Sequence, residues 1–538
     1  MNSKKTSLWL PFVIILTLVI GIIVGSYFSS TFGRKFSIPT GNKIDAILNL
    51  IYREYVDSVN IDDLVEGAIP KIINELDPHS VYIPAKELQA INEDMEGHFS
   101  GIGVQFSIQN DTVMVVNVIS GGPSEKVGLQ PGDRIVTIND SLFVGSDITN
   151  ERVMKNLRGE KGSIVNVGIK RIGSNELYNY TITRGDIPLY SVDVAYQIRP
   201  GIGFIRINKF GGTTYNEFIV SISELLSEGC ESFIIDLRGN SGGYLTAAIN
   251  IINEFLPRGR LIVYTEGRAS PRSETIANGT GTIQREPLVI LTDEWSASAS
   301  EILAGAIQDN DRGTIIGRRT FGKGLVQNQF SLPDNSALRL TIARFYTPSG
   351  RSIQKKYELG KGEEYEMDLL IRYEHGEFDT ADSIKQDNNP RYETRIGRIV
   401  YGGGGIMPDI FVPRDTAGAS SYFTNLINRN IIYEFAFQYT DRNRNLKNKF
   451  EDYQSLLAYL KSQPLLDEVV SFAESKGIRR RPTLIEISRK QIENLTQAYI
   501  IRDFFGNDGF YPVYLATDPV VKKAVEVIQE GRAFPEKP

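Results

Sequence analysis

Ser298 and Lys323 are the residues of this sequence whose types and spacing point most directly to chemistry. Ser298 lies in a run of small residues, and Lys323 follows 25 positions later between two glycines. A serine hydroxyl becomes a nucleophile when a neighbouring base takes its proton, and a lysine amine is such a base once burial lowers its pKa. The sequence has three histidines, all distant from Ser298 along the chain: His79, His98 and His375. A Ser-His-Asp triad assembled from distant positions stays open, but a Ser-Lys dyad requires fewer coincidences and is our working hypothesis.

Three further positions complete this candidate site. Ser298 opens a predicted helix, so the N–H of Ala299 is unused by the helix and is available to an oxyanion. A second donor requires backbone without a side chain, and Gly243 in a glycine turn provides it. Gln327, four positions after Lys323, can orient the amine. Each motif alone has a simpler interpretation: a serine helix cap for Ser298, and an exposed cationic turn for Lys323.

The elements around these residues alternate between strands and helices. Short apolar strands are predicted at residues 203–207, 233–236, 288–291, 314–316 and 338–342. Apolar residues at helical spacing predict helices near 218–226 and from about Ser298. This order is typical of a partly parallel sheet with helices packed against it. The polar segment from about 360 to 401 is expected to be rich in loops.

Composition bounds the class of protein. A length of 538 residues indicates two to four domains. The net charge of −6 gives no basic footprint for nucleic acid, and none is expected as a partner. The single cysteine, Cys230, excludes an intrachain disulfide and is expected to be a buried structural thiol.

The amino-terminal sequence predicts a membrane-spanning helix and the side of the membrane on which the rest of the chain lies. Lys4 and Lys5 precede an uncharged run of about 21 residues, 8–28, which is long enough to cross a bilayer as a helix. The two lysines favour the cytoplasmic side, so the rest of the chain is predicted to face outward. A cleaved signal peptide is the alternative to this membrane anchor.

Residues 97–188 change to short strands with glycine turns, and this region resembles a PDZ domain. The resemblance implies that a peptide's terminal carboxylate is captured by backbone N–H groups, and that the peptide adds as an extra strand. The residues expected to bind it are Ser100, Gly101, Ile102 and Gly103. The alternative is that the glycines only permit a tight hairpin.

Taken in order, the motifs resemble the C-terminal processing peptidases, also called tail-specific proteases. The resemblance covers about residues 40 to 412 and is carried by segments 76–80, 236–245, 296–302, 320–324 and 405–409, together with Gln327. It implies that Ser298 is the nucleophile, Lys323 the base and Gln327 the orienting residue. It also implies a crotonase-like βαβ protease core and a single-pass inner-membrane protein whose catalytic part faces the periplasm. Three scattered histidines without clustered carboxylates give no expectation of a metal site, and no cofactor is expected.

Three other positions take their interpretation from the same resemblance. Arg158 matches a PDZ arginine thought in some relatives to couple peptide binding to assembly of the site, although a surface turn is an equal alternative. Asp309 matches a common family position and is interpreted as structural. Ser241 departs from the glycine or proline that relatives often carry, which does not matter if Gly243 is the donor.

We therefore expect a multidomain α/β protein with an inserted, mainly β PDZ domain. Its parts are a membrane anchor or signal helix at 1–30, an N-terminal helical segment at 31–96, the PDZ domain at 97–188, the protease core at 189–414 and a helical region at 415–538. The predicted function is serine endopeptidase activity near the C-termini of flexible protein tails, gated by the PDZ domain. An inactive PDZ scaffold and a crotonase-like enzyme acting on acyl-thioesters are the alternatives. The helical region is open between a homodimer interface, a substrate-restricting cap and a partner platform.

Overall fold

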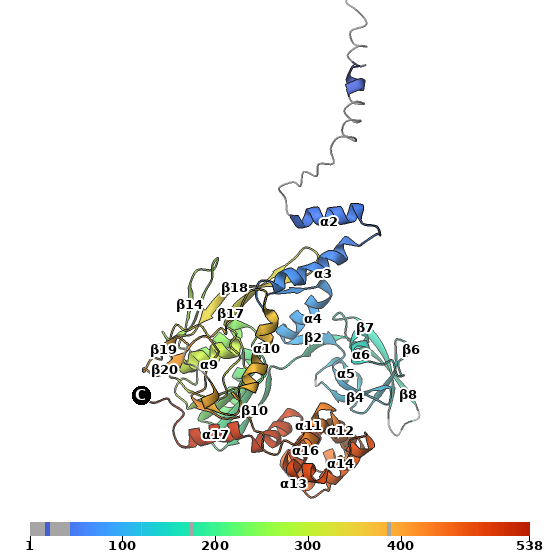
Figure 1. Cartoon of the computed structure of the whole chain (residues 1–538). Coiled ribbons are helices and arrows are strands. Elements are labelled where there is room, and N and C mark those ends of the chain that lie inside the picture. Colours follow the sequence, from blue (N-terminus) through green and yellow to red (C-terminus); the bar gives the residue numbers. More distant parts are fainter. Residues whose placement is uncertain are drawn as a thin grey trace, which may run out of the picture. The chain divides into compact units, whose positions relative to one another are not determined.

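The computed structural model describes residues 15, 17–21, 43–119, 121–171, 174, 176–384 and 389–537 (Figure 1). The chain divides into two compact units, residues 1–72 and 73–538. The first unit contains helix α2 (Lys43–Glu54) and most of α3 (Ile61–Asn74), in agreement with the predicted helical segment. Helix α2 buries none of its residues.

The prediction of a single-pass inner-membrane protein with its catalytic part facing the periplasm is corrected. Among the residues that the structure describes, no helix combines the length and the apolar character needed to cross a membrane. Most of the run 8–28, on which that prediction rested, lies outside the described residues.

The PDZ region begins after helix α4 (Ala85–Glu96) and is built on a sheet whose strand β3 lies at the edge. The sheet order is β3 (Val104–Gln109), β4 (Thr112–Val118), β5 (Arg134–Ile138), β7 (Ile164–Lys170) and β8 (Leu177–Thr183), and β6 (Ser141–Leu142) pairs with β5. Helices α5 (Pro123–Val127) and α6 (Asn150–Leu157) complete it. Strands β2 (His98–Gly101) and β9 (Gly185–Pro188) pair where the chain enters and leaves. Because one edge of β3 is unpaired in the sheet, it can accept a further strand.

The protease core is a six-stranded sheet in the order β10-β11-β12-β15-β16-β21. These strands are β10 (Val192–Arg199), β11 (Ile202–Ile207), β12 (Ser232–Asp236), β15 (Leu288–Thr292), β16 (Thr314–Gly317) and β21 (Ile410–Phe411). All neighbours after β10 and β11 are parallel. The predicted alternation of strands and helices is thus confirmed.

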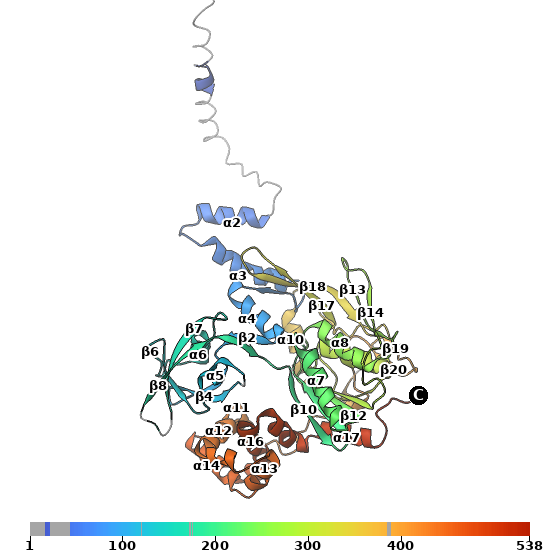
Figure 2. The same ribbon diagram turned by 180° about the vertical axis from the view of Figure 1, so that it is seen from behind.

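Both faces of this sheet are buried, which explains why its strands are almost continuously apolar. Ile235 and Ile290 pack with helices α7 (Thr214–Ser227), α8 (Leu245–Phe255) and α9 (Ala299–Asp309). The neighbouring residues Ile234 and Val289 face the opposite way and pack with α17 (Pro519–Gln529). Figure 2 shows α7 beside β10 and β12, with α8 next to it.

A second sheet carries the segment that contains the candidate base. Strand β18 (Ala337–Tyr346) pairs with β1 (Val81–Ile83), with β17 (Leu325–Ser331) and with β13 (Leu261–Glu266), and β13 pairs with β14 (Ser273–Ile276). Since β17 begins two residues after Lys323, the sheet fixes the direction in which the chain leaves that residue.

The expectation of loops between 360 and 401 is wrong in part. Residues Gly362–Glu374 form helix α10, followed by the short strands β19 (Arg391–Glu393) and β20 (Ile399–Tyr401). The helix buries only Tyr365 and Arg372, seven positions apart, so its many polar residues masked the helical pattern.

The carboxy-terminal region is helical, as predicted. It contains α11 (Ser421–Asn428), α12 (Ile431–Arg442), α13 (Tyr453–Lys461), α14 (Leu465–Ser475), α15 (Pro482–Ile487) and α16 (Arg489–Tyr514), which share a hydrophobic core of their own. Cys230 is buried in the protease core and accepts a hydrogen bond from Gln197, as expected of a structural thiol.

Candidate active site

Ser298 stands at the turn between strand β15 and helix α9 in a backbone conformation that serine rarely adopts. Its φ is 54° and its ψ is −113°. Such a conformation costs about 1–3 kcal/mol and persists only where the surroundings impose it. The N–H of Ser298 donates to Glu301 Oε2 at 2.9 Å. The turn thereby presents a half-buried serine hydroxyl at the start of a helix.

Gly242 lies against this turn and Gly243 against the backbone of Phe210, and neither has room for a side chain. A Cβ at Gly242 would stand 2.7 Å from Ser298 Cβ, and a Cβ at Gly243 would stand 2.1 Å from the carbonyl oxygen of Phe210. The N–H of Gly242 is bound to Asn240 Oδ1 at 2.9 Å, which leaves Gly243 as the donor with no recorded partner in the described chain.

Asn240 joins the glycine turn to the nucleophile turn. Its carbonyl oxygen accepts from the N–H of Ala297 at 3.0 Å and from Ser300 Oγ at 2.9 Å. Between those two residues, the N–H of Ala299 makes no recorded hydrogen bond within the described residues. The arrangement leaves the N–H groups of Ala299 and Gly243 available to a developing oxyanion.

Lys323 lines the same cleft as Ser298, a space of about 790 Å³ that also contains Gly243, Ala299 and Gln327. Burial is the main cause that lowers the pKa of Lys323, and the positive charge of Arg339 lowers it further, against the opposing effects of Glu301 and Asp77. A lysine with a lowered pKa holds more neutral amine near neutral pH, which is the form that can accept a proton.

Glu301 connects the nucleophile turn to the lysine loop. This fully buried carboxylate accepts from the N–H groups of Ser298, Gly322 and Lys323, at 2.9, 2.7 and 2.8 Å, and from Thr320 Oγ1 at 2.5 Å. Burial raises its pKa, while the four hydrogen bonds lower it. Sequence reasoning missed this residue, although a glutamate three positions into a helix is a known capping signal.

Gln327 reaches the site, but its amide is engaged elsewhere. Gln327 Nε2 donates to the backbone carbonyl oxygen of His79. Nor does the structure contain a hydrogen bond between Ser298 Oγ and Lys323 Nζ, two residues that it describes. The predicted residues therefore share one cleft without being connected to one another by hydrogen bonds.

The histidines do not offer an alternative base in this cleft. His98 lies in strand β2 and His375 follows helix α10, and neither lines the cleft. His79 is close enough to Lys323 for their charges to interact, but burial, reinforced by Lys323, lowers the pKa of His79 to about 4. Its Nε2 is also occupied by Tyr365 Oη at 2.8 Å.

The predicted peptide-binding residues lie at the start of the unpaired strand β3. Ser100 and Gly101 end β2, and Ile102 and Gly103 form the turn into β3. The N–H groups of Ile102 and Gly103 make no recorded hydrogen bond among the described residues. Arg158 stacks over the ring of Phe99 at 4.1 Å, and a Cβ at Gly101 would be 3.7 Å from the Arg158 side chain.

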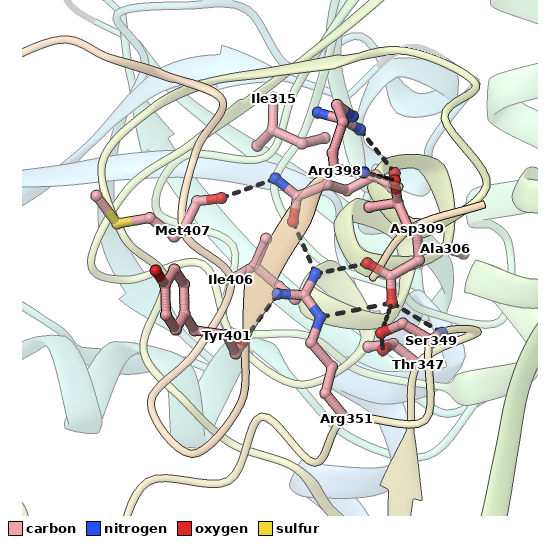
Figure 3. A network of polar contacts seen from close by, with 12 residues as sticks. Ala306, Asp309, Ile315, Thr347, Ser349, Arg351, Arg398, Tyr401, Ile406 and Met407 are labelled. Atoms are coloured by element: carbon pink, nitrogen blue, oxygen red, sulfur yellow. Dashed lines mark hydrogen bonds and ion pairs between the residues drawn. The ribbon is translucent and has the colours of Figure 1, made fainter. Parts of the chain in front are cut away.

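Asp309, at the far end of α9, belongs to a buried polar network (Figure 3). Its carboxylate pairs with the fully buried Arg351 at 2.6 Å and accepts from Ser349 Oγ at 2.7 Å. Arg351 also donates to Gln308 Oε1 and to the carbonyl oxygen of Tyr401. This network fixes the helix that begins at Ser298 and does not line the cleft.

Together, a serine in a strained turn, a buried lysine and unoccupied backbone donors form the candidate site. Family models match four stretches: the N-terminal domain of the activating protease CtpB at 30–87, a PDZ domain at 100–182, peptidase family S41 at 201–362, and a family of unknown function at 422–506. The predicted PDZ domain is confirmed.

Named relatives agree with these matches. The chain is 34% identical over 318 residues to the carboxy-terminal processing protease CtpB of Bacillus subtilis, over 59% of this chain and 66% of that protein. It is 36% identical to a carboxy-terminal-processing protease of Bartonella bacilliformis, over 57% and 71%, and 33% identical to CtpA of Bacillus subtilis, over 65% and 76%. Among solved structures, the photosystem II D1 C-terminal processing protease is 29% identical, with a TM-score of 0.33 over 57% of this chain and 83% of that chain.

The chain belongs to the carboxy-terminal processing proteases of peptidase family S41. This membership confirms the resemblance and the multidomain fold, and it favours a peptidase over the inactive PDZ scaffold. The chain spans about two thirds of the length of CtpB, so its own substrates and mechanism are matters for proposal.

Proposed function

We propose that this protein is a serine endopeptidase that cleaves proteins near their C-termini with a Ser298–Lys323 dyad. The observation that supports it best is that both residues line one cleft and that their backbones are joined through Glu301. The division of the chain after residue 30 that was predicted above stays a proposal with it. The role of residues 415–538 also stays open between the three predicted alternatives, a homodimer interface included.

The reaction begins with neutral Lys323. Its amine takes the proton of Ser298 Oγ as that oxygen attacks the scissile carbonyl carbon. The N–H groups of Ala299 and Gly243 stabilise the negative charge that develops on the carbonyl oxygen. The protonated Lys323 then gives its proton to the leaving amine, and the acyl group stays on Ser298. Water, deprotonated by Lys323, releases the acyl group and restores the serine hydroxyl.

The PDZ domain supplies the substrate. A flexible tail pairs with the unpaired edge of β3, and its terminal carboxylate binds the N–H groups between Ser100 and Gly103. Arg158 is stacked on Phe99 beside this turn, where it can contact a bound tail.

Docking of a tail is proposed to complete the catalytic site. The motivation is that Ser298 Oγ and Lys323 Nζ, both in the described part of the chain, share the cleft without a hydrogen bond between them. Deletion of residues 97–188 should reduce both the cleavage rate and the selectivity for tails. A deletion variant with unchanged rate and selectivity would show that the PDZ domain gates nothing.

The test of the proposed function is cleavage of an unstructured reporter with an apolar C-terminus. The full chain should cut it near that end, and Ser298→Ala should abolish cleavage while retaining binding of the tail. Equal binding without cleavage by either protein would instead support a scaffold.

A further inference from the structure

A ring of hydrogen bonds joins the loop of Lys323 and the strand β17 that follows it to side chains from distant parts of the chain. The N–H of Gly324 donates to Gln354 Oε1 at 2.8 Å. Gln354 Nε2 donates to Tyr365 Oη at 3.3 Å, and Tyr365 Oη lies 2.8 Å from His79 Nε2. The carbonyl oxygen of His79 accepts from Gln327 Nε2, which returns the ring to strand β17.

The ring fixes the orientation of its two glutamine amides. Because the N–H of Gly324 needs an acceptor, the oxygen of Gln354 must face it, and the Nε2 of Gln354 must face Tyr365. Because the His79 carbonyl accepts only, Gln327 must present its Nε2 to it. The Oε1 of Gln327 then remains available as an acceptor at the cleft that Lys323 also lines.

Tyr365 and His79 form the link of the ring that lies farthest from Lys323. Tyr365 Oη accepts from Gln354 Nε2 and shares a hydrogen bond with His79 Nε2, in which the donor is set by the histidine tautomer. Burial and the charge of Lys323 lower the pKa of His79 to about 4, so its imidazole is neutral near neutral pH.

The turn that contains His79 is itself anchored. Asp77 Oδ1 accepts from the N–H groups of His79 and Ser80, both at 2.9 Å, and from Thr341 Oγ1 at 3.0 Å. Thr341 lies in β18, the partner strand of β17. The carbonyl oxygen that holds Gln327 is thus fixed to the sheet that carries Gln327.

We propose that His79 and Tyr365 are positioning residues for the catalytic base Lys323. The ring of hydrogen bonds that they close holds Gly324, just before β17, and Gln327, within β17. It thereby fixes the position of Lys323 and the orientation of the Gln327 amide. This inference rests on the proposed Ser298–Lys323 dyad. Neither residue touches the substrate in this scheme; both act through the lysine segment.

Loss of the ring should change the proton affinity of Lys323 as well as its place. The charged groups around Lys323 are Arg339, Glu301 and Asp77, and those around His79 are Lys323, Asp77 and Lys355. None of them is altered when the hydroxyl of Tyr365 is removed. Water admitted beside Lys323 would relieve its desolvation, so its pKa would rise towards the ordinary value.

The experiment compares kcat, KM and the pH dependence of kcat for the full-length protein and four variants on the tail reporter. Tyr365→Phe removes one hydroxyl and keeps the aromatic ring over which the Lys355 amine lies. Tyr357→Phe removes a hydroxyl from the same aromatic cluster but outside the ring of hydrogen bonds, and is the matched control. His79→Leu removes the hydrogen-bond partner of Tyr365, whereas His79→Gln keeps a side chain that can donate or accept at a similar reach.

Tyr365→Phe and His79→Leu are expected to lower kcat at neutral pH by about tenfold or more, with little change in KM, and to move the half-maximal kcat to higher pH. Tyr357→Phe should behave as wild type, and His79→Gln should recover most of the loss. Wild-type kcat and pH midpoint in Tyr365→Phe would overturn the inference. The inference would also be overturned if Tyr365→Phe lowered kcat and the unfolding temperature but left the pH midpoint unchanged, because such a result is a structural effect alone. Unchanged cleavage by Lys323→Ala would instead remove the dyad on which the inference rests.

Discussion

Ser298 and Lys323 share one carboxylate: the backbone N–H of each donates to Glu301 Oε2, at 2.9 and 2.8 Å. A single buried side chain therefore couples the position of the nucleophile to that of the base. It also connects to Gly322 and Thr320, so the whole lysine loop is attached to the first turn of α9.

Glu301→Gln should reduce kcat by at least about tenfold, because an amide presents only one acceptor atom to four donors. Each carboxylate oxygen accepts from two of these donors, so the amide nitrogen leaves two of them without their acceptor, and each should lower the free energy of unfolding by about 1–3 kcal/mol. Steady-state kinetics and chemical denaturation measure the two effects. Glu363→Gln, at the exposed start of α10, is the control and should change neither. Full activity in Glu301→Gln would contradict the coupling.

Gly242→Ala tests whether the glycine turn must lie against the nucleophile. Its Cβ would meet Ser298 Cβ at 2.7 Å, so cleavage should be lost. Gly239→Ala is the control: both glycines have a positive φ, but the nearest atom to a Cβ at Gly239 would be 3.8 Å away. The control should lose about 1–2 kcal/mol of stability and keep its activity. If both variants lose activity equally, backbone strain and not the contact with Ser298 is responsible.

The pH dependence of kcat should follow the lowered pKa of Lys323. A base whose pKa is lowered becomes neutral at lower pH, so kcat should rise with pH and reach half its maximum below the pKa of about 10.4 of an ordinary lysine. Arg339→Gln removes a charge that lowers this pKa and should move the midpoint to higher pH. Arg344→Gln, on the exposed side of the same strand, is the control. A midpoint unmoved by Arg339→Gln would mean that this charge does not act on the base.

The Asp309–Arg351 pair should matter for folding. Both side chains are completely buried, so Arg351→Met leaves an unpaired buried carboxylate and should cost about 3–5 kcal/mol of unfolding free energy. Arg272→Met breaks an exposed pair with Glu274 and should cost no more than about 1 kcal/mol. Thermal and denaturant unfolding give both values, and equal losses would contradict a structural role for the buried pair.

Periodicity and composition predicted the strands of the core, the helix after Ser298 and the helical carboxy-terminal region, because apolar spacing is a local property. They did not predict the role of Glu301 or the ring through Gln354, Tyr365 and His79. Those contacts join residues that are distant in sequence, and a hydrogen bond leaves no periodic trace. Helix α10 was missed because its buried face is so narrow.

The central claim is that Lys323 is the base for Ser298. The most direct measurement compares cleavage of an unstructured reporter with an apolar C-terminus by the full chain and by Lys323→Ala, with binding of the tail measured in parallel. We expect both proteins to bind the tail and only the wild type to cut it. Cleavage by Lys323→Ala at the wild-type rate would show instead that another group takes the proton from Ser298.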